Sequence, residues 1–182
     1  MINIYKLRFT ITQLEIIRFL FLKAGMSFNA RALATALDVS QPAISKAIPS
    51  IRKHGIINTQ KDKDSGRWLI ELNRDEPWVM ELKRADNLRL VYESGLSGFL
   101  EQEFPGGTII LFGSFSRGDD TVESDIDIAI IGRKEKEVRL ETYEKILGKR
   151  IVINFYSSLK DIHKDLRENL CNGIVLTGGI EL

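Results

Sequence analysis

The chain is poor in the residues that build covalent or metal-based scaffolds. Its 182 residues include one cysteine, Cys171, and two histidines, His54 and His163. A single cysteine excludes an internal disulfide and any zinc site made of several cysteines, and two isolated histidines do not suggest a metal cluster. No apolar run reaches the roughly 18–20 residues that a membrane span needs. The N-terminal residues lack the pattern of a signal peptide, so we expect a cytoplasmic protein with no membrane partner.

The composition indicates a folded protein with two different parts. Hydrophobic residues make up 43% of the chain and charged residues 28%, which is typical of globular domains rather than disordered chains. The net charge of +1 hides an asymmetry. Residues 1–75 hold 12 Lys and Arg against 6 Asp and Glu, whereas the remainder holds 14 against 19. A basic first part and an acidic second part predict two units with different partners.

The first part predicts three helices followed by a β-hairpin. Thr12 and Glu15 have the spacing of a capping box, and the apolar residues after them recur at helical spacing. Asn29 and Ser40 are the expected caps of two further helices. Two β-prone runs with a charged turn between them predict the hairpin, and they comprise residues 56–60, 61–66 and 67–72.

The run ARALATALDVSQPAISKAI resembles the helix-turn-helix core of bacterial and archaeal transcription regulators. Together with the hairpin, the order of elements is similar to a winged helix-turn-helix over about the first 75 residues. The resemblance implies a recognition helix after Ser40, in which Pro49 removes a backbone hydrogen bond and should bend the helix. The residues expected to bind DNA are Gln41, Ser45, Lys46, Arg52, Lys53, Lys61 and Lys63.

The basic surface of this part has a second explanation. It could serve protein contact or dimerisation, which would make the protein a homodimer. Trp68 is expected in the core or at a domain interface rather than as a platform for stacking bases.

The second part contains the motif that carries chemistry. Residues 108–112 have the pattern of a buried strand, and Gly113 and Ser114 follow at once. A polar loop then leads to a second strand that contains Asp125 and Asp127. Because these aspartates are two apart on a strand, their carboxylates project from the same face. Paired carboxylates suit Mg²⁺ together with phosphate oxygens, and a glycine lets the backbone approach a phosphate closely.

This stretch closely resembles the signature of the DNA polymerase β-like nucleotidyltransferase superfamily, especially its minimal nucleotidyltransferase branch. The letters that carry the resemblance are GSFSRG and, about ten residues later, SDID. The resemblance implies that Gly113, Ser114, Arg117 and Ser124 bind the nucleotide triphosphate. It also implies that Asp125 and Asp127 are catalytic and bind Mg²⁺, with ATP or another NTP as substrate.

The third carboxylate of the family lies on a later strand, which here matches residues 150–156. Asn154 is the position that aligns best, and an amide is a weak Mg²⁺ ligand that cannot accept a proton. Asn154 is therefore either a weak metal ligand or an ordinary polar strand residue. Asp120 and Lys149 are expected on solvated surfaces.

The sequence thus predicts an α/β (α+β) fold in two parts. Residues 1–74 form a winged helix-turn-helix, and residues 75–182 form a minimal nucleotidyltransferase domain with a mixed sheet flanked by helices. The expected function is transfer of a nucleoside monophosphate, AMP from ATP, to a hydroxyl. The resemblance permits a protein acceptor, as in antitoxins that adenylylate a partner toxin. The rival hypothesis is a DNA-binding regulator whose transferase domain is inactive and senses a nucleotide.

Overall fold

The computed structural model describes residues 9–180, so the N-terminal residues 1–8, on which part of the signal-peptide expectation rests, lie outside the described part. The chain divides into two compact units between Val79 and Met80. The sequence predicts the boundary between residues 74 and 75. Helix α4 (Pro77–Glu93) begins between the predicted boundary and the observed one. Each unit is described by itself below.

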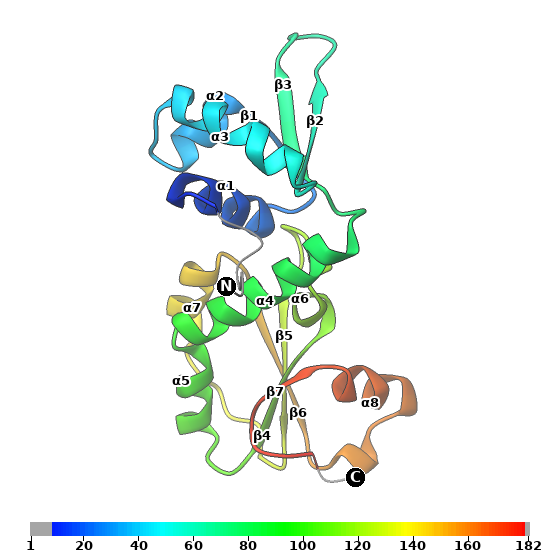
Figure 1. The fold of residues 1–182 in the computed structure, drawn as a ribbon. Helices are drawn as coiled ribbons and strands as arrows, with labels where there is room; N and C mark the ends of the chain where they lie inside the picture. Colours follow the sequence, from blue (N-terminus) through cyan, green and yellow to red (C-terminus); the bar gives the residue numbers. More distant parts are fainter. Residues whose placement is uncertain (1–8, 181–182) are drawn as a thin grey trace, which may run out of the picture. The chain divides into compact units, whose positions relative to one another are not determined.

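The first unit combines three helices with a small antiparallel sheet (Figure 1). Strand β3 lies between β1 and β2. Helices first, then a hairpin whose second strand also pairs with β1, is the topology of a winged helix. In chain order the elements are α1 (Ile11–Leu22), β1 (Ser27–Asn29), α2 (Ala30–Ala36), α3 (Gln41–Lys53), β2 (Ile57–Lys61) and β3 (Trp68–Leu72).

Side-chain caps fix where the helices of this unit begin. Asn29 and Ser40 accept hydrogen bonds from the backbone N–H groups three residues on, as the sequence predicts. The prediction for α1 was wrong: the cap is Thr10, which exchanges hydrogen bonds with Gln13 in a capping box. Both Thr10 and Thr12 precede a suitable partner at the same spacing, and only the fold decides between them.

Helix α3 is amphipathic and closes the core of the first unit. Ile44, Ala47 and Ile51 are buried on one face, as expected for apolar residues at helical spacing. Helix α3 packs against α1, whose Ile16 and Leu20 are also buried. The helix continues through Pro49 as one element, although proline cannot donate the hydrogen bond that position 49 would otherwise make.

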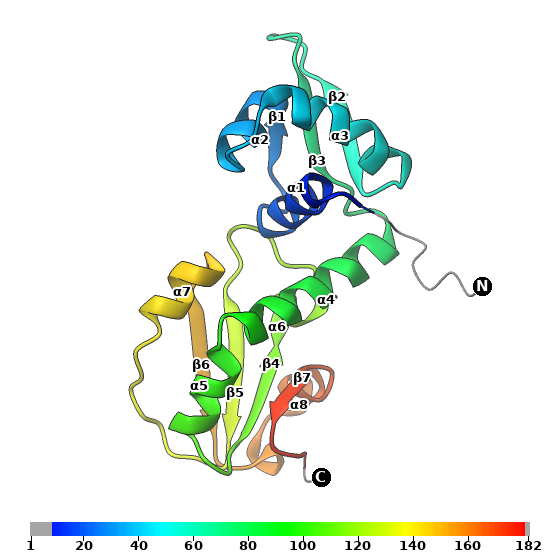
Figure 2. The same cartoon turned by 60° about the vertical axis from the view of Figure 1, so that its left-hand side comes forward.

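The second unit is a four-stranded mixed sheet with helices on both faces (Figure 2). The strand order is β6-β5-β4-β7; β4 is antiparallel to β5 and β7, whereas β5 and β6 are parallel. After α4 the elements are α5 (Leu96–Glu103), β4 (Thr108–Phe112), α6 (Gly113–Arg117), β5 (Ile126–Ile131), α7 (Glu141–Leu147), β6 (Ile151–Tyr156), the short 3-10 helix η1 (Leu159–Asp161), α8 (Lys164–Cys171) and β7 (Ile174–Thr177).

Alternation along the strands separates two apolar clusters. Ile126, Ile128 and Ile130 face one side of the sheet, where residues of α4, α5 and α7 cover them. Ala129 faces the opposite side, which η1 and α8 cover. Asp127 is two residues from Ala129 on the same strand, so its side chain lies on the face that α8 covers. The mixed α/β architecture predicted from the sequence is confirmed.

No helix within residues 9–180 is long and apolar enough to cross a membrane.

Replacing Pro49 tests the cost of proline in α3. We expect Pro49→Ala to raise the free energy of unfolding by about 1–3 kcal/mol, because alanine restores a helical donor while the unfolded chain gains some freedom. Urea unfolding would measure the change, with Ser50→Ala as a control for a neighbouring helical position. A Pro49→Ala variant no more stable than this control would contradict the prediction.

Candidate nucleotide site

The Gly-Ser turn and the paired aspartates meet where β4 ends and β5 begins. The antiparallel register pairs Phe112 with Asp127, so the turn at Gly113 lies beside the Asp127 side chain. Gly113 has a φ of 71°, a left-handed conformation that glycine adopts at little cost. A Cβ at this position would overlap the Asp127 carboxylate. Position 113 therefore requires glycine for both its conformation and its close approach to Asp127.

The serine of the turn is the second residue of the short helix α6. Phe115 of the same helix is buried in the core, and the Ser116 hydroxyl donates to the Gly113 carbonyl oxygen at 2.9 Å. Ser114 is half-buried. Phe115 and Ser116 thus fix the turn on the core, while Gly113 and Ser114 stay partly open to solvent, as a phosphate-binding turn requires.

The two aspartates lie in an electrostatically unfavourable position. Asp125 and Asp127 are both half-buried. Partial burial raises the pKa of Asp127, repulsion by the Asp125 carboxylate raises it further, and the Arg117 guanidinium opposes these effects. A divalent cation between the carboxylates would relieve this repulsion. The site therefore has the charge and oxygen donors that fit a hard cation such as Mg²⁺.

Strand β6 supplies no carboxylate beside this pair. In the parallel register, Val152 is opposite Asp127, whereas Asn154 is opposite Ala129, two residues further along. Asn154 therefore lies on the same face of the sheet as Asp127. The metal role of its amide stays a prediction. Within residues 9–180 no three His, Cys, Asp or Glu side chains group closely enough to form a metal site. A metal held by two carboxylates needs its other ligands from phosphate and water.

Two other predicted nucleotide contacts have local partners. The Arg117 Nε lies 3.2 Å from Asp119 Oδ2, in a solvent-exposed pair. The Ser124 hydroxyl oxygen accepts a hydrogen bond from the Thr121 backbone N–H at 3.0 Å. Both side chains are near the turn and the aspartates in sequence and fold, and their contacts with a nucleotide stay predictions. Ser124 also shapes the loop that leads to Asp125.

Several residues near the site were missed by the sequence reasoning. Tyr156 has a pKa raised by burial and by the negative charge of Asp127, so its phenol belongs to the same face. The expectation that Asp120 and Lys149 are solvated was wrong, since they are 1% and 7% exposed. They form a buried polar cluster with Lys83 and Asn87 of α4.

A signal for this cluster was present in α4. Lys83 and Asn87 lie between Val79 and Val91 at intervals of four residues, so all four share one face of the helix. Polar residues within an apolar stripe indicate buried groups that need partners. The sequence does not say which residues those partners are.

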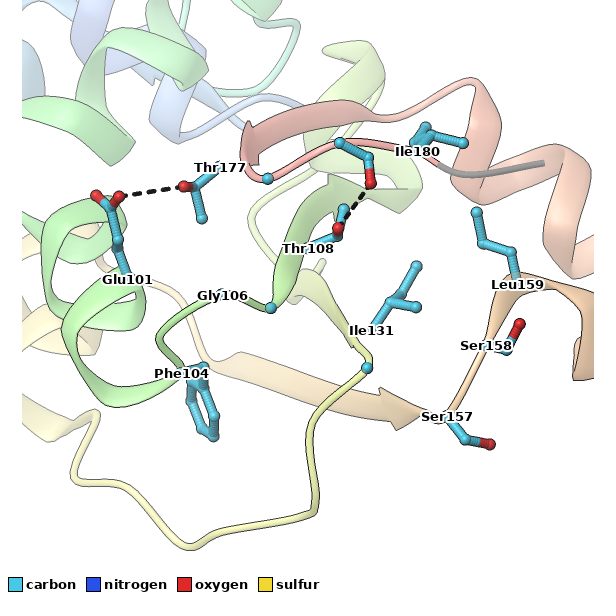
Figure 3. Close-up of a pocket in the computed structure, with 14 residues that line it drawn as sticks. Glu101, Phe104, Gly106, Thr108, Ile131, Ser157, Ser158, Leu159, Thr177 and Ile180 are labelled. Atoms are coloured by element: carbon cyan, nitrogen blue, oxygen red, sulfur yellow. Dashed lines mark hydrogen bonds between the residues drawn. The ribbon is translucent and has the colours of Figure 1, made fainter.

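A hollow of the second unit lies at the other end of the sheet. It has a volume of about 540 Å³ and is lined by strand ends such as Thr108, Ile131 and Thr177 (Figure 3). Among the described lining residues Glu101 is the one carboxylate, and it accepts a hydrogen bond from the Thr177 hydroxyl at 3.3 Å. The hollow lacks the paired carboxylates of the turn site, so it is not the candidate active site.

The first unit presents a basic surface on α3 and the hairpin. All seven residues predicted to bind DNA are exposed there, namely Gln41, Ser45, Lys46, Arg52, Lys53, Lys61 and Lys63. A groove of about 300 Å³ between α3 and the hairpin has an apolar lining that includes Ile48 and Trp68. Trp68 is 56% exposed, so it lies outside the core of the unit, and its place at an interface stays a prediction. A neighbouring hollow adds Arg31 and Arg67, which extend the cationic surface.

The hairpin tip is shaped by one carboxylate. Asp62 accepts hydrogen bonds from the Ser65 backbone N–H at 2.7 Å and from its hydroxyl at 2.6 Å. These bonds lower the pKa of the exposed Asp62. Lys61 and Lys63, which flank Asp62, are held at the tip of the hairpin, where a wing would approach DNA.

Comparison with known proteins supports a nucleotidyltransferase domain in the second unit. A family model described as Nucleotidyltransferase domain matches residues 93–177, a little under half of the chain. These residues contain the Gly113 turn, both aspartates and all four strands of the sheet.

One curated relative has a more specific name. It is the "Putative protein adenylyltransferase" of Methanocaldococcus jannaschii, which is 51% identical over 47 residues. The match covers 25% of this chain and 47% of the relative, so it spans about half the length of that protein.

Three solved structures are similar over just more than half of the chain. The Adhesin competence repressor of Streptococcus pyogenes has 24% identity and a TM-score of 0.43, with 56% of this chain and 71% of that chain covered. MepR of S. aureus, in a DNA complex, has 18% identity and a TM-score of 0.38, with 52% and 81% covered. The zinc-responsive MarR family member ZitR of Lactococcus lactis has 18% identity and a TM-score of 0.40, with 56% and 66% covered.

Because these TM-scores are below 0.5, the winged-helix assignment rests on the strand pairing and element order of the first unit alone.

The raised pKa of Asp127 predicts a variant that is more stable than the native protein. Since the folded-state pKa lies above the ordinary value of about 3.9, stability from this group is present below pH 4 and is lost as pH rises through the raised pKa. Asparagine cannot ionise, so the variant Asp127→Asn avoids this loss of stability. Its thermal midpoint at pH 7 should therefore exceed that of the native protein.

The difference should vanish near pH 3, where native Asp127 is protonated. Thermal melts without divalent metal, followed by circular dichroism at both pH values, would measure it. Asp165→Asn, on the exposed surface of α8, is the matched control and should show no such gain. An Asp127→Asn variant less stable than the native protein at pH 7 would contradict the prediction that ionised Asp127 destabilises the fold.

Proposed function

We propose that the second unit is a Mg²⁺-dependent nucleotidyltransferase that uses ATP or another NTP. The observation that carries the proposal is the close approach of the Gly113 turn to the Asp127 carboxylate at adjoining strand ends. In this proposal the backbone of the turn binds phosphate, and the carboxylate pair beside it binds a cation. The match of residues 93–177 to a nucleotidyltransferase domain supports the same chemistry.

Each side chain has a defined part in this proposal. The Ser114 hydroxyl and the backbone N–H groups of the turn donate hydrogen bonds to phosphate oxygens. Arg117 adds positive charge near the phosphates. Asp125 and Asp127 would hold Mg²⁺, which when bound neutralises charge on the phosphates.

The reaction is an in-line displacement at the α-phosphorus. An acceptor hydroxyl oxygen forms a bond to that phosphorus, the bond to the β-phosphate oxygen breaks, and pyrophosphate leaves. The hydroxyl proton passes to solvent water in the process. Val152 lies opposite Asp127, where a third carboxylate could accept the proton or bind a metal. In this proposal the contribution of the chain to the reaction is therefore mainly positioning and phosphate binding.

The acceptor in this proposal is a hydroxyl on a partner protein. The catalytic unit, residues 80–182, is small, and a macromolecular acceptor can bring its own target group to an open site. The name of the Methanocaldococcus relative, a protein adenylyltransferase, supports AMP transfer from ATP to a protein. An antitoxin that adenylylates a toxin-like partner is one form of this activity.

A second candidate function is favoured by the composition of β6. Val152 is apolar and Asn154 is an amide, so β6 offers no carboxylate beside the aspartates to act as a general base. A site of this kind could bind a nucleotide without transferring it. The protein would then be a DNA-binding regulator that senses a nucleotide.

We also propose that the first unit binds DNA through α3 and the hairpin. The exposed cations lie on the helix and on the wing, with Arg31 and Arg67 next to the groove between them. Cations so distributed suit contacts with phosphates on DNA. A nucleotidyltransferase with such a unit could bind its own operator. Dimerisation through the same surface is the competing use of these residues.

Transfer can be tested with labelled ATP and Mg²⁺ on the purified protein and any co-purified partner. We expect Asp125→Asn and Asp127→Asn each to reduce labelling about 100-fold or more, the range for losing a group that stabilises transition-state charge. Asp165→Asn is the control and should label normally. Mass spectrometry would identify a nucleotide adduct.

Two outcomes of the labelling experiment would change the assignment. If both aspartate variants label normally, the proposed site is wrong. If nucleotide binds but neither the protein nor a partner is ever labelled, the regulator function replaces the transferase function.

DNA binding can be tested by gel shift with the DNA upstream of the protein's own gene. Lys46→Ala and Arg52→Ala should each weaken binding, and each should reduce the steepness of its salt dependence, because each removes a phosphate contact. Lys164→Ala, on the exposed surface of α8, is the control. Binding that does not weaken steeply as salt rises would count against a winged helix that contacts phosphates.

A further inference from the structure

A buried charge cluster lies beneath the loop that connects the two halves of the nucleotide site. Asp120 is 1% exposed and forms ion pairs with Lys83, which is 0% exposed, and with Lys149. The Asp120 Oδ1 also accepts a hydrogen bond from Asn87 Nδ2 at 2.7 Å. One carboxylate is thus held by two ammonium groups and an amide away from water.

Burying these charges is costly, so the cluster calls for a reason other than stability. Buried ion pairs of this kind are often no more stabilising than apolar residues of similar volume, and they can instead select one arrangement of the chain. Here the partners come from three places in the sequence: Lys83 and Asn87 on α4, Asp120 in the loop, and Lys149 just before β6. The cluster therefore fixes these segments against one another.

Lys149 differs from Lys83 in what else it contacts. Its ammonium group donates to the backbone carbonyl oxygens of Thr121 and Ser124, the latter at 3.2 Å. These carbonyls belong to the irregular segment that ends at Asp125. The next residue, Arg150, accepts a hydrogen bond from the Ile126 N–H through its carbonyl oxygen at 2.8 Å. Lys149 and Arg150 together hold both sides of Asp125.

The other end of the same loop is fixed against α4. Gly118 has a φ of 83°, and a Cβ there would lie 2.5 Å from the Met80 carbonyl oxygen and 2.9 Å from the Arg84 backbone nitrogen. The loop therefore packs directly on the helix backbone. Asn87 also donates to the Phe115 carbonyl oxygen at 2.9 Å, which ties the cluster to the helix of the Gly113 turn.

We propose that Lys149 is a positioning residue for the nucleotide site, acting through its two backbone contacts to hold the loop that presents Asp125 next to Asp127. The Asp120 carboxylate keeps the Lys149 ammonium in place, and Asn87 links the assembly to the turn. Lys149 does not touch the nucleotide in this arrangement. This role rests on the proposed nucleotide-binding function of Asp125 and Asp127.

The cluster offers a matched pair of variants. Lys149→Met and Lys83→Met each remove one buried ammonium group, and each leaves Asp120 paired with the other lysine. Only Lys149→Met removes the donor to the Thr121 and Ser124 carbonyls. Asp120→Asn is unsuitable because it leaves two buried lysines without a carboxylate. Lys145→Met, on the exposed surface of α7, is the control for the chemical change itself.

Hydrogen exchange of backbone amides, followed by mass spectrometry, measures the loop directly. In Lys149→Met we expect exchange in residues 118–126 to accelerate about tenfold or more, the size expected for losing hydrogen bonds from a charged donor. Peptides from β4 and α5 should keep their native protection. Lys83→Met and Lys145→Met should leave the loop protected relative to the rest of the unit.

Nucleotide binding gives a second readout. Affinity for a fluorescent ATP analogue with Mg²⁺ should fall about tenfold or more in Lys149→Met, and it should stay near native in Lys145→Met. Equal acceleration of exchange throughout the unit, or the same loop exchange in both buried-lysine variants, would show a merely structural role and overturn the proposal. Native loop protection in Lys149→Met would overturn it as well.

The two readouts separate this proposal from the function on which it rests. If the native protein binds no nucleotide, the proposed function fails, and the exchange pattern still shows whether Lys149 holds the loop. If the native protein binds nucleotide and the Lys149→Met loop exchanges faster with unchanged affinity, the positioning role is refuted while the proposed function stands.

Discussion

The nucleotide site depends on the contact between the Gly113 backbone and the Asp127 carboxylate. A side chain at position 113 would occupy the space of the carboxylate, so the two strands can adopt their register at this point only with glycine. That register pairs Phe112 with Asp127 and aligns the turn with the aspartate. The backbone N–H groups of the turn and the Asp127 carboxylate then lie together without any further adjustment of the backbone.

The chain between these strands must leave the turn and return with Asp125 correctly placed. Loops are ordinarily mobile and solvated, and this one is instead fixed from beneath by Asp120 and Lys149. Desolvation of the buried charges lowers the stability of the fold, and the repulsion between Asp125 and Asp127 lowers it further. Both features lower the stability of the fold in the same small region, which is typical of functional sites.

The two units carry opposite charge and different chemistry. The first unit exposes cations on α3 and the hairpin, whereas the second surrounds a pair of carboxylates that favour a cation and a nucleotide. The Asp62 carboxylate organises the hairpin tip, and its negative charge lies between Lys61 and Lys63 without cancelling the basic surface. A protein with both units could couple nucleotide chemistry to occupancy of DNA.

Local patterns in the sequence determined much of this protein. Apolar spacing and caps such as Asn29 and Ser40 predicted the helices of the first unit, and the Gly113 turn with Asp125 and Asp127 predicted the candidate site, because such signals act over a few residues. Strand β1, helix α8 and strand β7 were not predicted, since short segments carry weak local signals. Only the tertiary structure decided that Val152 neighbours Asp127 and that Asp120 and Lys149 are buried. Strand register and charge pairing depend on residues far apart in the chain, and no local pattern encodes them.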